Sequence, residues 1–388
     1  MSNNRKRWIV PWKSSLTKPS IYHCISRVVG RSFVFGANER EHFRMLMRMC
    51  EKFTGCRVLS YCIMSNHFHI LLEVPPMPED GIPTPQLLQR LGVFYSEAQV
   101  AEIEKEMASA AAVRTRGEFE MPPVDDEGLV LTPAQELVMA EQQAAQRVEE
   151  IRSRFTRRMH DLSEFMKSLL ERFTKWFNRS HSRSGTLWED RFKSVIVESG
   201  EAARTMAAYI DLNPVRAGMV SDPAEYRWSS YGEAIGGGNR GNGKKAREGL
   251  VRVFENPDAR FKNPDGEWRE VARRYRRLMG MALERKAMKA KVDSKAVRLK
   301  TKNSAEALES DENETVLREL GMAKMLRCRV RYFTDGAVIG SKEFVNEAFV
   351  NARERFSEKR KDGARKMRGA AAAARGLFTA RDLRLGIG

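Results

Sequence analysis

The sequence lacks any run of about 18 apolar residues, the length that a membrane-spanning helix requires. Cysteine is scarce: the five cysteines form no CxxC pair and their number is odd, which argues against a disulfide scaffold and a zinc finger. Near the N-terminus no apolar run precedes a small-residue cleavage site, so the sequence predicts no secretory signal. We therefore expect a reduced, cytoplasmic protein with no membrane partner.

Acidic residues are the minority among the charged side chains. The 51 Asp and Glu residues stand against 68 Lys and Arg, which gives a net charge of +17. A surplus of this size favours a polyanionic partner, with nucleic acid ahead of an anionic membrane. The hydrophobic content of 42% excludes global disorder, and 388 residues leave room for two or three domains.

The acidic residues concentrate in one block of the chain. Residues 76–150 carry a net charge of −10, whereas the chain before them carries +8. The block starts in a proline-rich stretch, and its Ala-, Glu- and Gln-rich runs around 100–112 and 133–150 predict two helices. We expect a helical insertion at about residues 76–157. A solvated arm and a lid that repels nucleic acid are both open interpretations of it.

A second boundary lies at residues 236–245, where glycine predicts a flexible linker. The linker separates an N-terminal part, residues 1–235, from a basic C-terminal region, residues 246–388. We expect the C-terminal region to be mainly helical and to bind DNA, with a cationic stretch at 286–302 that suits a DNA backbone or a tail. Ser341 is a candidate helix N-cap, and a helix-turn-helix-like DNA reader is one interpretation of that part.

Hydrophobic periodicity predicts alternating strands and helices in the N-terminal part. The patterns predict strands at residues 21–29, 57–63, 67–74 and 192–197, and helices at 39–53, 162–177 and 201–212. Without the insertion, the order is strand–helix–strand–strand–helix–strand–helix. This order fits an α+β fold in which helices cover one antiparallel sheet, the ferredoxin-like arrangement.

Two histidines alternate on the third predicted strand, in the segment His67-Phe68-His69. Because alternate side chains of a strand share a face, His67 and His69 project together while Phe68 packs behind them. Two imidazoles side by side on a rigid strand suit a metal ion. Two ordinary exposed or buried histidines fit the pattern as well, so both interpretations are open for this segment alone.

Tyr209 and Asn213 lie four residues apart at the predicted end of a helix and therefore share a face. A tyrosine hydroxyl can attack phosphorus and form a covalent ester, although its pKa of about 10 calls for a base or a metal-polarised electrophile. An amide oxygen of Asn213 is a candidate third ligand of the same ion. A half-buried aromatic followed by an Asn-Pro helix stop explains these residues equally well.

These segments, together with two others, resemble the single-tyrosine HUH transposases, and among them the REP-associated tyrosine transposases. The resemblance is carried by His67-Phe68-His69, Leu187–Lys193, Tyr209–Val220 and Tyr226–Tyr231, in this order. It covers about residues 18–235 less the insertion. The chain departs from the family at Ser65, where proline is usual, and the C-terminal region lies outside the resemblance.

The resemblance implies the HUH endonuclease fold and a metal-dependent endonuclease and strand transferase for single-stranded, hairpin-forming DNA. In this role Tyr209 is the nucleophile, and His67, His69 and Asn213 are ligands of Mg²⁺ or Mn²⁺. The implied reaction leaves a 5′-phosphotyrosine enzyme and a free 3′-hydroxyl, and a homodimer is compatible with it. The alternative is a domesticated, non-catalytic DNA-binding regulator with the same fold, which would be free to lose any of these four residues.

Several residues in or beside the matched segments are candidates for contact with DNA. They are Arg27, Arg31, Trp188, Arg191, Lys193 and Arg216. The cations also fit solvated surface positions, and the tryptophan also fits a core position.

Overall fold

The computed structural model describes most of the chain. The described residues are 15–113, 131–236, 242–254, 264–283, 326, 331–334, 336–355, 358–366 and 376–381. The cationic stretch 286–302 and residues 237–241 of the expected linker lie outside them. Within the described part, no helix is long and apolar enough to cross a membrane.

The chain divides into two compact units. Residues 1–45, 57–76 and 172–388 form unit 1, and residues 46–56 and 77–171 form unit 2. Two helices, α1 (Ala37–Thr54) and α5 (Leu162–Ser180), begin in one unit and end in the other.

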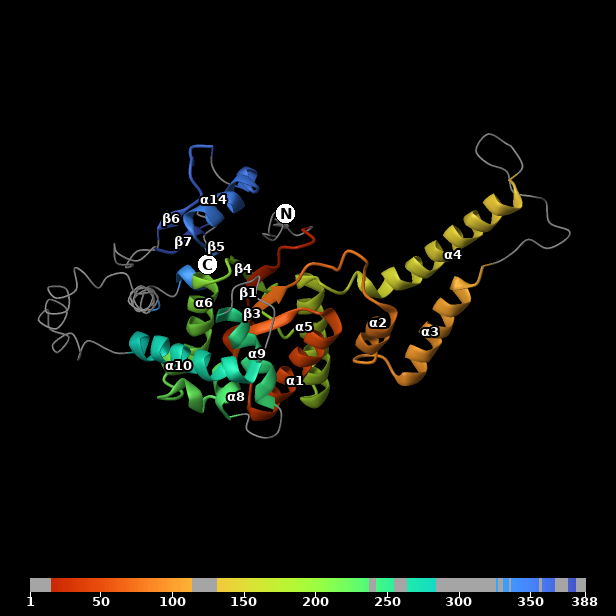
Figure 1. Cartoon of the computed structure of the whole chain (residues 1–388). Helices are drawn as coiled ribbons and strands as arrows, with labels where there is room; N and C mark the ends of the chain where they lie inside the picture. Colours follow the sequence, from red (N-terminus) through yellow and green to blue (C-terminus); the bar gives the residue numbers. More distant parts are fainter. Residues whose placement is uncertain are drawn as a thin grey trace, which may run out of the picture. The chain divides into compact units, whose positions relative to one another are not determined.

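Unit 1 contains a seven-stranded sheet with the strand order β2-β3-β1-β4-β5-β7-β6 (Figure 1). The strands are β1 Ser20–Arg27, β2 Arg57–Ile63, β3 His67–Val74, β4 Lys193–Val197, β5 Gly336–Gly340, β6 Arg365–Lys366 and β7 Phe378–Arg381. The helices that belong wholly to this unit are α6 Glu201–Asp211, α7 Asn213–Arg216, α8 Ser230–Gly236, α9 Asn242–Phe254, α10 Pro264–Leu283, α13 Arg331–Thr334 and α14 Lys342–Val350. Short 3₁₀ turns lie at Val29–Arg31, Pro223–Glu225 and Arg353–Arg355.

The first four strands form the predicted ferredoxin-like sheet. β1 pairs antiparallel with β3 and β4, and β2 pairs antiparallel with β3. With α1 after β1 and α5 before β4, the chain order and the spatial order β4-β1-β3-β2 confirm the expected arrangement.

Beyond β4, the sheet continues with strands that lie outside the predicted four-stranded arrangement. β5 pairs parallel with β4, so the sheet is mixed, and β7 and β6 extend it further. These strands come from the C-terminal region, which is therefore not purely helical. The apolar pair Val338-Ile339 lies between two glycines, and so short a run carries too little periodicity to distinguish a strand from a turn.

The predicted N-cap at Ser341 is confirmed. Its hydroxyl accepts a hydrogen bond from the backbone N–H of Phe344 at 3.2 Å and opens α14. Because α14 follows strand β5 directly, this part belongs to a strand–helix unit and not to a helix-turn-helix pair.

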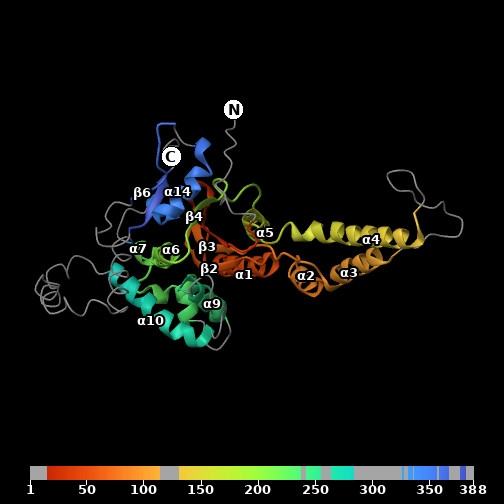
Figure 2. The same cartoon turned by 45° about the horizontal axis from the view of Figure 1, so that its top comes forward.

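Two cores cover the two faces of the four-stranded part of the sheet. On one face, Leu71 and Val195 pack with α6 and with residues of α9 and α10. On the other face, Phe68 packs on Phe43 with ring centroids 4.7 Å apart. Figures 1 and 2 show α6 beside these strands.

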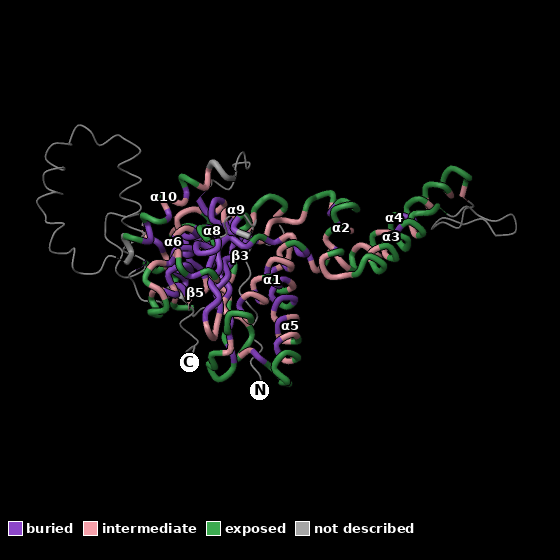
Figure 3. Tube along the Cα trace, turned by 90° about the horizontal axis from the view of Figure 1, so that it is seen from below, coloured by how far each residue is buried: buried purple, intermediate pink, exposed green. Residues whose placement is uncertain are grey.

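Unit 2 contains α2 (Thr84–Leu91), α3 (Glu97–Ala111) and α4 (Pro133–Thr156). The last two confirm the predicted pair of helices, and each begins with a capping box, at Ser96 and at Thr132. Figure 3 shows that both are mostly exposed, and Met107 and Ala144 are their buried residues. Solvated helices with so little core gain stability from capping and ion pairs such as Arg154–Glu106 at 2.6 Å.

Candidate active site

The strand register brings the two histidines of the predicted metal site onto the face covered by α6. His69 lies opposite Ile25 of β1, and His67 lies opposite Arg27. Because side chains alternate along a strand, His67 and His69 share this face with Leu71, which belongs to the core that contains α6. The face predicted for the two imidazoles is therefore the one on which the tyrosine helix packs.

The two imidazoles lie next to each other, with ring centroids 5.1 Å apart and planes at 82°. Nδ1 of His67 lies 2.7 Å from Oδ1 of Asn66, whose Nδ2 donates to the Arg31 carbonyl at 2.9 Å. That second bond fixes the orientation of the amide, so Oδ1 accepts and His67 Nδ1 carries the proton. Nε2 of His67 is then left with its lone pair, the form that binds a metal ion.

Burial keeps the histidines of the site uncharged at neutral pH. Burial lowers the pKa of His67 to about 4, and the positive charge of Arg27 acts in the same direction. The pKa of His69 is lowered well below its usual range, again mainly by burial. Both therefore remain neutral imidazoles, as metal ligation demands.

Tyr209 lies on α6 with its ring against the same histidines. Its centroid is 5.9 Å from that of His69 and 6.1 Å from that of His23, with both pairs close to edge-on. The ring of Phe333 stacks on Tyr209 at 4.6 Å, and Tyr209 is 1% exposed. The structure thus brings together the predicted nucleophile and the predicted histidines, under a cover from the C-terminal region.

Asn213 is the first residue of α7, directly after the end of α6. Its amide nitrogen donates to the carbonyls of Tyr209 and Ile210 at 3.0 and 3.2 Å, so it caps the last turn of the tyrosine helix. With its nitrogen engaged, the carbonyl oxygen is the atom of this amide that could bind a cation.

By chemical type, the three predicted ligands suit a hard divalent cation in part. Two imidazole nitrogens and one amide oxygen are three ligands, and Mg²⁺ ordinarily completes its six with water and substrate phosphate oxygens. Within the described residues, no group of three or more His, Cys, Asp and Glu side chains is arranged to hold a metal ion. A cation here would therefore depend on Asn213 and on the DNA phosphate for its remaining ligands.

Four of the cations predicted to contact DNA are exposed around this face: Arg27, Arg31, Arg191 and Lys193. Arg27 ends β1 opposite His67, and Lys193 begins β4 opposite Ile25. By register, both share a face with the two imidazoles. Arg31 has a positive φ of 55°, which turns its carbonyl towards Asn66.

The structure places the other two candidates in roles of their own. Trp188 packs among aromatic rings on the opposite face of the sheet, and its indole donates to Thr174 at 2.9 Å. Arg216 lies with its guanidinium 4.8 Å from the centre of the Tyr209 ring and donates to the Leu326 carbonyl at 2.8 Å. The guanidinium of Arg216 is partly buried by these contacts, and this burial lowers the pKa of the side chain.

His23 is a residue of the site that the sequence interpretation missed. It lies on β1 inside an apolar run, and its Nε2 is 3.0 Å from Nδ1 of His69. The available signal was topological: in a ferredoxin-like sheet, β1 lies between β3 and β4, so every second residue of β1 faces the same layer as the histidine pair. Composition and spacing alone gave no reason to single it out.

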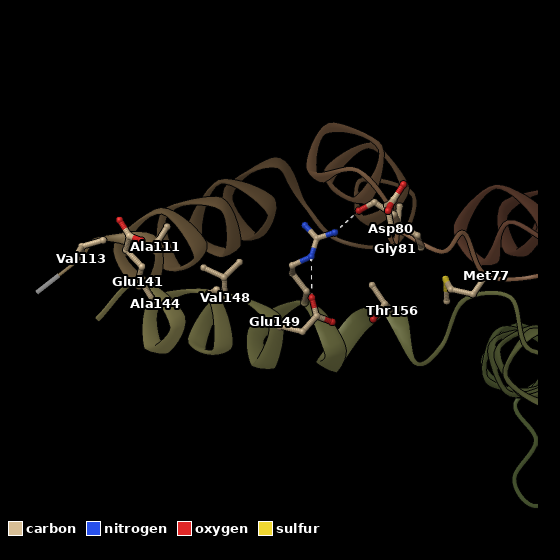
Figure 4. Close-up of a pocket in the computed structure, with 13 residues that line it drawn as sticks. Met77, Asp80, Gly81, Ala111, Val113, Glu141, Ala144, Val148, Glu149 and Thr156 are labelled. Carbon is tan, nitrogen blue, oxygen red and sulfur yellow. Dashed lines mark hydrogen bonds and ion pairs between the residues drawn. The ribbon is translucent and has the colours of Figure 1, made fainter. Parts of the chain in front are cut away.

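A separate cavity of about 600 Å³ lies in unit 2 beside α3 and α4 (Figure 4). Arg152 lies on its wall, 3.5 Å from a Glu149 oxygen and hydrogen-bonded to Thr84 at 2.7 Å. Among the described residues, the lining contains no histidine, cysteine or tyrosine. The cavity is therefore a packing gap of the helical insertion and offers no nucleophile.

Comparison with known proteins finds a family match in the N-terminal part of the chain. Residues 17–79, which contain β1 to β3 and both predicted histidine ligands, match the family model of IS200-like transposases, which confirms the resemblance drawn from the motifs. A solved structure of a REP-associated tyrosine transposase bound to a REP hairpin is similar at 11% identity and a TM-score of 0.32. That similarity covers 68% of this chain and 93% of the other. No curated protein matches the sequence.

Proposed function

We propose that this chain, whose residues 17–79 carry the signature of the IS200-like transposases, is a metal-dependent endonuclease and strand transferase for single-stranded, hairpin-forming DNA. The observation that carries the proposal is the position of Tyr209, edge-on to His69 at 5.9 Å on one face of the sheet. A hydroxyl nucleophile and neutral imidazoles in one place suit attack on a phosphodiester. The DNA substrate would place the enzyme in the cytoplasm.

In the proposed reaction, the Tyr209 oxygen forms a bond to phosphorus as the bond from phosphorus to the 3′-oxygen breaks. The products are a 5′-phosphotyrosine ester and a 3′-hydroxyl, which takes up a proton as the phenol releases one. The ester conserves the energy of the broken bond, so another 3′-hydroxyl can reverse the step and join a new strand.

His67, His69 and Asn213 would hold Mg²⁺ or Mn²⁺. When bound, the cation would polarise a non-bridging phosphate oxygen and make phosphorus more electrophilic. The protein contributes by holding both imidazoles neutral and by fixing the turn after α6, where Asn213 bonds the Tyr209 carbonyl at 3.0 Å.

Arg216 is well placed to stabilise the developing charge. A guanidinium 4.8 Å from the ring centre favours the phenolate over the phenol, which offsets part of the cost of deprotonating Tyr209. Arg27 and Lys193 would meet phosphates of the bound strand from the same face of the sheet.

A single chain supplies all of these groups. The ring centroids of Tyr209 and His69 lie 5.9 Å apart within one molecule, which supports attack by the tyrosine of the same chain. A homodimer, if it forms, would then be dispensable for chemistry.

The test uses labelled single-stranded DNA that contains the palindromes flanking the gene of this protein. The chain is incubated with this DNA and Mn²⁺ or Mg²⁺, and a covalent adduct is sought on a denaturing gel. We expect an adduct that requires the metal and is absent in Tyr209→Phe. Tyr226→Phe is the matched control, because Tyr226 is also buried and its hydroxyl donates to the Ile63 carbonyl.

DNA that is retarded on a native gel without any adduct, equally in the wild type and in Tyr209→Phe, would contradict the proposal. That result would support the non-catalytic DNA-binding regulator.

A further inference from the structure

His23 connects the backbone of the C-terminal region to a predicted metal ligand. Its Nδ1 lies 3.0 Å from the carbonyl oxygen of Phe333, and its Nε2 lies 3.0 Å from Nδ1 of His69. The ring is fully buried and lies nearly parallel to that of His69, with planes at 18° and centroids 5.1 Å apart. Both ring nitrogens of His23 therefore have a partner, and only one of those partners can donate.

The Phe333 carbonyl determines which nitrogen of each histidine carries a proton in this series of hydrogen bonds. A carbonyl oxygen can only accept, so Nδ1 of His23 must carry a proton. In a neutral ring, Nε2 of His23 then has a lone pair and accepts, so the donor is Nδ1–H of His69. His69 consequently keeps the lone pair on Nε2.

The opposite order is disfavoured at a buried site. With the proton on Nε2 of His23, its Nδ1 lone pair would face the lone pairs of the Phe333 carbonyl, leaving two buried acceptors without a donor. His69 would then carry its proton on Nε2 and could not bind a cation through that atom.

We infer that His23 is a positioning residue that sets the tautomer of His69, with the Phe333 carbonyl as its anchor. This inference rests on the proposed function only for the role of His69 as a metal ligand. The C-terminal region, which lies outside the matched segment 17–79, thereby helps to prepare the site.

His67 offers an internal comparison, since its tautomer depends on a different hydrogen bond. Its partner Asn66 is the adjacent residue, and the pair needs no contact with the C-terminal region. His69 depends on a residue 46 positions away, which itself depends on one 310 positions further. Substituting His23 should therefore change the tautomer of His69 and leave the tautomer of His67 unchanged.

The test is the histidine tautomer, read from ¹H–¹⁵N correlation spectra of the full chain labelled with ¹⁵N-histidine. Six histidines give a small spectrum, and His69→Gln assigns the signals of His69. We expect the metal-free wild type to show Nε2 as the unprotonated nitrogen of His69. His23→Phe should move His69 towards the other tautomer, and His23→Gln, whose amide oxygen still accepts from Nδ1–H, should restore it.

A second readout is Mn²⁺ affinity measured by electron paramagnetic resonance without DNA. Loss of a residue that orients a metal ligand typically weakens binding by about 10- to 100-fold, and we expect this for His23→Phe but not for His23→Gln. Cys24→Ala is the control, because Cys24 is equally buried on the same strand but faces the opposite side of the sheet.

Protonation of Nε2 of His69 in the wild type would overturn the inference, and this holds even if His23→Phe does not fold. An unchanged tautomer in folded His23→Phe would overturn it too. A wild type that has the expected tautomer but binds no Mn²⁺ would refute the proposed metal site, while the dependence of the tautomer on His23 would still support the inference.

Discussion

Arg216 shows how the position of a single side chain changes its interpretation. In the sequence it is a candidate phosphate ligand beside the Asn-Pro segment; in the structure its guanidinium lies 4.8 Å from the centre of the Tyr209 ring. Phosphate binding and stabilisation of charge at Tyr209 are both compatible with this position, but removal of the side chain has a different effect in each case. One role concerns the strength of DNA binding and the other concerns the chemical step.

We predict that Arg216→Met slows adduct formation at least about tenfold while DNA affinity on a native gel changes little, because loss of one charge-stabilising group commonly costs more in rate than this. Arg191→Met is the matched control, an exposed arginine from the same set of candidate DNA contacts. Equal losses of affinity and rate in Arg216→Met would instead indicate a phosphate ligand.

Asp211 is a buried carboxyl two residues after Tyr209. It accepts hydrogen bonds from the Tyr231 backbone N–H at 2.9 Å and from the Tyr275 hydroxyl at 2.7 Å. Burial raises its pKa from 3.8 to about 7. Between pH 4 and pH 7, Asp211 therefore keeps its proton in the folded chain but has lost it in the unfolded chain. This group makes the fold less stable as pH rises through that range.

We predict that Asp211→Asn removes this dependence. The free energy of unfolding of the variant, relative to wild type, should increase between pH 4 and pH 7 by up to about 4 kcal/mol, the value of a shift of this size. The buried histidines, with lowered pKa values, make the fold less stable as pH falls from 6.5 to 4. This effect is the same in both proteins and cancels in the difference between them. Urea titrations at several pH values measure the difference, and a constant difference would contradict the prediction.

At the scale of elements, the short helix α13 and the strand β5 are the parts that complete the site. Phe333 of α13 covers Tyr209 at 4.6 Å, and its backbone carbonyl holds His23. Tyr209 is 1% exposed, so a substrate would reach its hydroxyl only after the side chains packed on it move, and Phe333 is one of these. The side chain of Phe333 thus covers the site, whereas its backbone carbonyl helps to order it.

We predict that Phe333→Ala speeds adduct formation several-fold, because the variant uncovers Tyr209 and keeps the carbonyl that anchors His23. Phe349→Ala is the control: it also removes a buried ring from the C-terminal region, at a typical cost of about 3–5 kcal/mol, and this ring packs against the guanidinium groups of Arg353 and Arg360. Adduct formation at the wild-type rate or below in Phe333→Ala would show that the ring does not limit access.

At the scale of the whole molecule, the arrangement of the site predicts an enzyme that works as a single chain. We predict that a mixture of Tyr209→Phe and His69→Ala forms no adduct, because each molecule lacks one half of its own site. Each variant is assayed alone beside the mixture at the same total concentration. Adduct recovered only in the mixture would place the tyrosine of one chain in the site of another.

The sequence by itself determined the four-stranded sheet, the histidine strand and the tyrosine helix. These depend on local patterns, such as the alternation of His67 and His69 and the helical spacing that ends at Asn213, which fix a face whatever the neighbours are. The same holds for the N-cap at Ser341 and for the two helices of the insertion, whose composition and capping residues act within a few positions.

Only the tertiary structure decided which distant residues complete the site. The parallel pairing of β5 with β4 joins residues about 140 positions apart, and the contact of His23 with Phe333 spans 310. Such contacts depend on the register of strands and on packing between layers, and no local periodicity encodes them. That is why the histidine pair and the tyrosine were predictable, whereas the residue that sets the His69 tautomer and the ring that covers Tyr209 were not.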